Sequence, residues 1–145
     1  MFENAAQVIR YALAGKATLT LVSLRTGVRY TYEIKKGRGG RKAPWFVSVL
    51  TGADNQTDYE FAGSIFPEAS AMGGPSVYRH GGKSQLSPLA PSVRAFAWAW
   101  SAFLAGGIPD ALEVYHEGRC GRCGRKLTVP ESIDSGLGPD CATRE

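Results

Sequence analysis

The residues best suited to chemistry are the three cysteines, which all lie close to the C-terminal end of the sequence. Cys120 and Cys123 form a Cys-x-x-Cys pair that is followed by Gly124, and Cys141 supplies a third sulfur. Two thiolates at this spacing can bind one metal ion from a tight turn, because glycine lets the backbone turn without a Cβ clash. A structural zinc ion takes four ligands, and His116 is the nearest suitable fourth donor. The pattern therefore predicts a zinc site formed by three cysteines and one histidine.

Other interpretations of these residues are open. Asp140, Glu117 and His80 are alternative fourth ligands. A thioredoxin-like redox pair is disfavoured, because such a pair lies between a strand and a helix in a βαβ pattern that is missing here. Disulfide bonding would leave one thiol over, and no secretory signal supports it.

The same segment resembles a known family. The motif Cys-x-x-Cys-Gly-Arg-x-Leu-Thr at Cys120–Thr128 is followed by Ser-Ile within Pro130–Ile133 and by Gly-x-Gly-Pro-x-Cys at Gly136–Cys141. It is similar to a short zinc-finger-like domain of unknown function found in phage and actinobacterial proteins, over about residues 116–142. The resemblance implies zinc binding and a phage or prophage setting, and it implies no reaction.

Composition indicates one globular unit. The chain has 145 residues, of which 43% are hydrophobic and 21% charged, and its net charge is +4. This balance is typical of a folded domain, and the mild basicity permits contact with nucleic acid without demanding it. The sequence lacks a signal-peptide pattern and an apolar run of membrane-spanning length, so we expect a protein of the bacterial host cytoplasm.

Two segments have the pattern of helices. Asn4 and Gln7 form a capping box that begins a helix ending near Ala14, with Gly15 at its C-terminal cap. A second and longer helix is expected from Pro91 to Ala105. Its core face consists of five apolar residues at helical spacing, namely Val93, Phe96, Trp100, Phe103 and Leu104.

Strands are predicted where the apolar period changes to two. The ranges 17–24 and 28–35 form a hairpin, in which Val28, Tyr30, Tyr32 and Ile34 are expected to face inward. Further strands are expected at 45–50 and 59–66, and 77–80 and 112–115 are short candidates. We therefore predict an α+β fold with an N-terminal helix, four or five mostly antiparallel strands, one long covering helix and a C-terminal zinc-stabilised lobe. The corresponding division is an α+β domain at 1–112 and a zinc-binding lobe at 113–145 packed on it.

Basic residues gather in the connection after the first hairpin. Within 35–42 the chain carries five cations and three glycines, and the cations are Lys35, Lys36, Arg38, Arg41 and Lys42. Such a loop can grip phosphates, because cations release counterions from nucleic acid. It can equally be a solvated hairpin connection. A second cationic strip would come from the cysteine segment, with Arg119, Arg122 and Arg125.

Trp98 lies on the opposite side of the long helix from its core face, near Arg94. An exposed tryptophan beside an arginine is typical of anchors that bind a protein partner. The interpretation that we favour is burial of Trp98 beneath the 67–87 loop or against the zinc segment, because large aromatic residues dominate cores.

The sequence indicates a protein without enzymatic activity. A catalytic zinc keeps one position open for water, whereas four donors are available here, and no triad or paired-carboxylate motif stands out.

The first functional hypothesis is a small phage-type zinc-binding protein that acts as a nucleic-acid-binding accessory factor. The alternative is a phage inhibitor, for example anti-CRISPR-like, that binds and blocks a host protein or nucleoprotein complex. No small-molecule substrate is indicated.

The zinc hypothesis predicts one zinc ion per chain in elemental analysis of the purified protein. Replacing Cys120, Cys123 or Cys141 by serine should expel the metal, since structural zinc in such segments contributes on the order of ten kcal/mol. His116→Ala should weaken zinc affinity too. Unchanged metal content in all three cysteine variants would end the hypothesis, and full affinity in the histidine variant would move the fourth ligand elsewhere.

Overall fold

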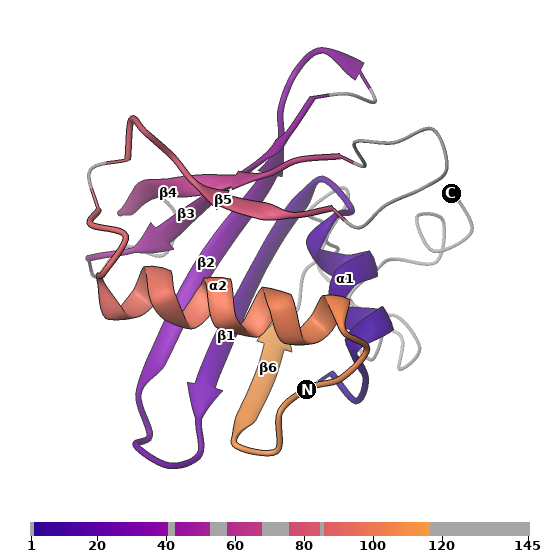
Figure 1. Cartoon of the computed structure of the whole chain (residues 1–145), viewed down its shortest axis with the longest axis vertical. Coiled ribbons are helices and arrows are strands. Elements are labelled where there is room, and N and C mark those ends of the chain that lie inside the picture. Colours follow the sequence, from indigo (N-terminus) through magenta and orange to yellow (C-terminus); the bar gives the residue numbers. More distant parts are fainter. Residues whose placement is uncertain (1, 41–42, 53–57, 68–75, 85, 117–145) are drawn as a thin grey trace.

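A computed structural model describes residues 2–40, 43–52, 58–67, 76–84 and 86–116. Within these ranges two helices and six strands follow one another along the chain (Figure 1). They are α1 (Ala5–Ala12), β1 (Lys16–Ser23), β2 (Arg29–Lys36), β3 (Trp45–Leu50), β4 (Tyr59–Ile65), β5 (Tyr78–His80), α2 (Pro91–Leu104) and β6 (Leu112–His116). The α+β class predicted from the sequence is thus confirmed.

The six strands form one antiparallel sheet in the order β5-β4-β3-β2-β1-β6. The expected number of four or five was wrong, because both short candidates pair at the edges of the sheet. β5 pairs with the end of β4, and β6 pairs with β1 after α2 has carried the chain back across the sheet (Figure 1). The proposed domain boundary between residues 112 and 113 therefore falls inside a strand of this sheet.

The helix boundaries follow from their capping residues. The Asn4 side chain accepts a hydrogen bond from the Gln7 backbone N–H at 2.9 Å, which is the N-cap expected from the sequence. The Gln7 side chain in turn accepts from the Glu3 N–H at 3.2 Å, so the capping pair is reciprocal although displaced by one residue. In α2, a proline at the first position replaces a side-chain cap.

The core lies between the two helices and one face of the sheet. Alternate residues of the central strands are buried there, as a strand with one covered face requires. They include Leu19, Leu21, Tyr32, Ile34, Val47, Val49 and Val114, which meet Val93, Phe96, Trp100 and Phe103 of α2. Val28 is an exception among the residues expected to face inward, since its side chain is 43% exposed. It precedes β2 in the hairpin turn and so escapes the strand alternation.

Tyr11 completes the hydrogen bonding of β1 beyond the end of β6. Pairing between β1 and β6 stops at Leu19 and His116, so within the described residues the adjacent Thr18 has no strand partner on that side. The Tyr11 hydroxyl donates to the Thr18 carbonyl at 2.8 Å and accepts from the Thr18 N–H at 3.0 Å. One side chain of α1 therefore satisfies both backbone groups, which would otherwise cost free energy at a partly buried position.

One buried and one partly buried tyrosine make the stability of the fold depend on pH in the alkaline range. The Tyr32 hydroxyl donates to the Ser92 carbonyl at 2.7 Å, and thus joins β2 to α2. Burial raises the pKa of Tyr32 above its usual value and raises the pKa of Tyr78 to about 12. Tyrosines of the unfolded chain ionise near pH 10. The stability gained by keeping these phenols protonated is therefore present below about pH 10 and is lost as pH rises toward the folded pKa values.

Tyr32→Phe should lower the free energy of unfolding at neutral pH by about 1 kcal/mol, because it removes a buried hydrogen bond. It should also make the free energy of unfolding fall less steeply above about pH 10, since one raised pKa is gone. Denaturant unfolding at a series of pH values measures both effects. Tyr30→Phe is the matched control for stability at neutral pH, because it leaves the hydrogen bond from Tyr32 to Ser92 in place. It does not serve as a control for the alkaline slope, since the charge of Tyr30 contributes to the raised pKa of Tyr32. Equal alkaline slopes for Tyr32→Phe and the unaltered protein would contradict the assignment.

Candidate functional site

The basic connection between β2 and β3 contains cations with different surroundings. Lys35 and Lys36 belong to β2, and Arg38 is exposed in the turn that follows. Gly39 and Gly40 both have positive φ, 119° and 79°, which glycine adopts without the strain that other residues incur. Arg41 and Lys42 lie outside the described residues.

Lys36 is held at the base of this connection. Its ammonium group donates to the Ala43 carbonyl and lies 3.9 Å from the centroid of the Trp45 ring. The Trp45 indole N–H donates in turn to the Leu13 carbonyl at 3.1 Å. Desolvation lowers the pKa of Lys36. Lys36 therefore serves to fix the hairpin against α1, and it is a poorer candidate for phosphate contact than its neighbours.

The strand register arranges further cations in a row across the sheet. Lys16 pairs with Lys35, Lys35 with Phe46, Phe46 with Ser64, and Ser64 with Arg79. Strands lie about 4.8 Å apart, so these five residues span about 19 Å. We call these five residues the cross-sheet row.

The cross-sheet row faces away from the helices. The residues that alternate with it, such as Ala17, Ile34 and Val47, are buried in the core, and successive side chains of a strand point to opposite faces. All three cations of the row are exposed. Lys35 has an ion pair with Glu33 at 3.2 Å, but the Lys35 side chain is 60% exposed, so the pair contributes at most about 1 kcal/mol.

Phe46 provides an aromatic surface in the middle of the cross-sheet row. Its side chain is 42% exposed, and its ring meets Phe61 edge-on with centroids 6.1 Å apart. A large aromatic side chain on an open sheet face is available to stack with a flat ligand. The row thus combines cations with a stacking surface.

Trp98 is exposed, with 54% of its side chain accessible, so the expectation that it is buried was wrong. The helical phase explains this, because Phe96 and Trp100 point into the core and Trp98 lies between them. Arg94, one turn earlier, is exposed as well.

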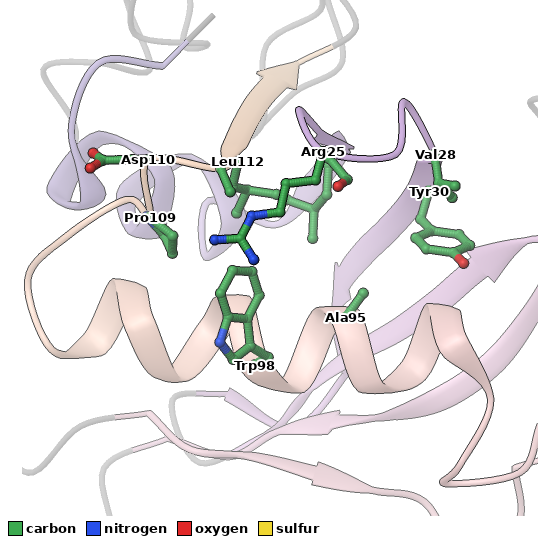
Figure 2. A pocket seen from close by; sticks show the side chains of 11 residues that line it. Arg25, Val28, Tyr30, Ala95, Trp98, Pro109, Asp110 and Leu112 are labelled. Atoms are coloured by element: carbon green, nitrogen blue, oxygen red, sulfur yellow. The ribbon is translucent and has the colours of Figure 1, made fainter.

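Trp98 lines a pocket at the end of the sheet where β1 turns into β2 (Figure 2). The pocket has a volume of about 400 Å³ and is formed by the 24–28 turn, α2 and the chain entering β6. Its walls are mainly apolar, and its lining residues include Leu21, Val28, Tyr30, Ala95, Trp98, Pro109 and Leu112. Arg25, Ser23 and Asp110 add polar groups, whereas Arg94 does not line it.

Of the predicted zinc ligands, His116 alone falls within the described residues. It is the last residue of β6, and its ring packs at 5.5 Å from Phe2 and 5.7 Å from Tyr11 between centroids. Cys120, Cys123 and Cys141, the alternatives Glu117 and Asp140, and the arginines at 119, 122 and 125 lie outside the described residues. The described part contains no cluster of three or more His, Cys, Asp or Glu side chains that could hold a metal. The zinc site therefore stays a prediction.

His80, the remaining alternative ligand, lies in β5 at the far edge of the sheet from β6. It pairs with Gly63 of β4, and its Nδ1 atom is buried with no hydrogen-bond partner among the described residues. β5 and β6 are the first and last strands in the sheet order, so the sheet does not bring His80 to His116.

Comparison with known proteins gives a family match for the C-terminal part of the chain alone. Residues 110–145 match a family of unknown function, DUF6011. This range covers β6 and the cysteine segment, and its description assigns no activity. No curated protein and no solved structure matches the chain. Among the described residues, no helix is long and apolar enough to cross a membrane.

Sequence reasoning missed two features. Lys16 and Arg79 are isolated cations in the sequence, and only the pairing of five strands puts them in line with Lys35. The pocket was missed because its walls come from segments that are distant along the chain. The one available signal was the position of Trp98 outside the core face of its helix.

The exposure of Trp98 generates a stability prediction. Trp98→Ala should change the free energy of unfolding by less than about 1 kcal/mol, as expected for a surface substitution. Trp100→Ala is the matched control on the same helix, and it should cost about 3–5 kcal/mol. Its ring is buried, and its indole N–H donates to the Ser76 carbonyl at 2.8 Å. Thermal and denaturant unfolding measure both, and a loss for Trp98→Ala as large as for Trp100→Ala would contradict the assignment.

Proposed function

We propose that this protein is a non-enzymatic nucleic-acid-binding factor, and that the outer face of its sheet contacts the nucleic acid. The observation that carries the proposal is the cross-sheet row, in which Lys16, Lys35 and Arg79 flank the exposed ring of Phe46. Cations along a surface neutralise phosphates, and an aromatic ring between them offers a stacking surface for a base.

The preferred partner in this proposal is a single strand. A base can stack on a flat sheet face only when it is unpaired, whereas the bases of a duplex are stacked on one another. Phe46 is one exposed ring on a row of about 19 Å, so we expect modest affinity with little sequence preference. Arg38, beside the row in the β2–β3 connection, is exposed and extends the positive surface.

The proposed zinc-binding segment follows β6 directly. A structural zinc ion there would stabilise a fold too small to be stable by itself, with Cys120, Cys123, Cys141 and His116 as the proposed ligands. Because four donors fill its coordination, the ion would have a structural role and no part in a reaction.

Inhibition of a host protein is the second candidate function. The exposed Trp98 favours it, since exposed tryptophans are common anchors at protein interfaces. Such a protein needs no affinity for free nucleic acid, so a binding titration separates the two candidates.

The proposal predicts that the unaltered protein binds fluorescent dT20 and rU20 in anisotropy titrations at low salt, with weaker binding to a duplex of equal length. Lys35→Glu combined with Arg79→Glu should weaken binding and flatten its salt dependence, since each lost phosphate contact lowers the slope by about 0.7 on a single strand. Phe46→Ala should cost about 1–3 kcal/mol of binding free energy, as loss of one stacked base implies.

The matched control is the pair Arg25→Glu and Arg94→Glu. It changes the net charge by the same amount but lies away from the outer sheet face. Equal loss in both double variants would reduce the effect to overall charge and reject the cross-sheet row. Lack of any binding by the unaltered protein at low salt would discard the nucleic-acid proposal and favour the inhibitor.

A further inference from the structure

The pocket beside Trp98 lies at the opposite end of the strands from the cross-sheet row. The chain runs along β1 from Lys16 to Ser23 and turns at 24–28, and this turn forms one wall of the pocket. The pocket also opens on the helix-covered side of the sheet, because Leu21 and Tyr30 line it from strand positions that face α2. It is therefore a separate site, and inferences about it do not depend on nucleic-acid binding.

The shape and lining of the pocket suit a small organic molecule. Its volume of about 400 Å³ lies within the range of roughly 300–1,000 Å³ that is usual for such sites. Leu21, Val28 and Leu112 give it aliphatic walls, and the indole of Trp98 gives it a flat aromatic one. Val28 and Trp98 remain 43% and 54% exposed, so apolar surface is left uncovered for a ligand to bury.

Arg25 gives the pocket a charge. Figure 2 shows its guanidinium group extending from the 24–28 turn toward the indole of Trp98, while the carboxylate of Asp110 points away from both. No carboxylate among the described residues lies within ion-pair distance of Arg25, and no lysine or histidine in the described ranges lines the pocket. Within that part of the chain, the guanidinium is thus a planar donor without an ion-pair partner that faces apolar walls.

We propose that this pocket binds a flat, apolar carboxylic acid, with the ring system of the ligand against Trp98 and its carboxylate on Arg25. A guanidinium forms two parallel hydrogen bonds with a carboxylate, and this geometry suits one planar anionic group. The rest of the ligand must be apolar, because the surrounding side chains offer hydrophobic contact. A highly charged phosphate ligand fits poorly, since one arginine beside mainly apolar walls cannot compensate several charges.

The experiment compares 2-naphthoate with 2-naphthamide, which has the same ring and a neutral polar group in place of the carboxylate. Isothermal titration calorimetry of the full chain should give at least about tenfold tighter binding for naphthoate, as expected from one charge-assisted contact. Arg25→Gln should weaken naphthoate binding by about tenfold and abolish the preference, leaving the binding of naphthamide unchanged. Trp98→Ala should weaken both probes by a similar factor, since the stacking surface serves both.

Arg94→Gln is the matched control, because Arg94 is an exposed arginine on the same helix as Trp98 that does not line the pocket. This variant should retain both affinities. Equal binding of the two probes by the unaltered protein, or no measurable binding of either, would overturn the proposal. So would an unchanged preference for naphthoate in Arg25→Gln, or an equal loss of naphthoate affinity in Arg94→Gln. Circular-dichroism melting of each variant confirms that the fold is retained, which the surface positions of Arg25 and Trp98 lead us to expect.

Discussion

The packing of Phe96 on the sheet is the contact on which the rest of this structure depends. Within the described residues two helices cover the sheet, and α2 is the longer of them. The Phe96 ring lies 5.0 Å between centroids from Tyr32 of β2, 5.0 Å from Tyr78 of β5 and 5.9 Å from Trp100, nearly parallel to the last. One side chain thus joins a central strand, an edge strand and the helix itself. Aromatic pairs of this kind stabilise a core beyond their buried area, by about 0.5–1.5 kcal/mol each.

The orientation that Phe96 gives to α2 also determines what the helix presents to solvent. Each residue turns about 100°, so when Phe96 and Trp100 point inward Trp98 must point outward. The same orientation brings the end of the helix beside α1, and from there the chain returns as β6, the strand that pairs with β1 (Figure 1). The pocket follows from this geometry, because the chain entering β6, the 24–28 turn and Trp98 surround a space that the small Ala95 side chain does not fill.

Much of this fold could be predicted from the sequence because its local signals are strong. The Asn4 cap, the alternation in β1 and β2 and the core face of α2 each result from interactions within a few residues, and the structure confirms them. The expected inward orientation of Val28 and the expected number of strands were wrong, because local patterns in the sequence do not determine where a strand begins or which short segments pair. Whether a three-residue segment such as Tyr78–His80 joins a sheet is decided by its pairing with a distant strand, which periodicity does not report.

The candidate sites, too, could be predicted only where their residues are close together in the sequence. The basic connection is visible in the sequence as a run of charge, but the sequence does not distinguish Lys36, held over Trp45, from the exposed Lys35. A cysteine pattern within one short segment can be recognised from the sequence alone, whereas a site assembled across five strands depends on the register of those strands.

The direction of β6 determines at which end of the sheet His116, the proposed zinc ligand, lies. β6 runs antiparallel to β1, so it ends at His116 beside Leu19, toward the end of the sheet that carries Lys16 and Lys35. His116, the last of the described residues, therefore lies toward the end of the sheet that carries the cross-sheet row and away from the pocket. In the proposed function, the arginines at 119, 122 and 125 follow His116 in the sequence and would supply further cations for the nucleic acid. The pocket, at the other end, would be free to bind its ligand whether or not nucleic acid is present.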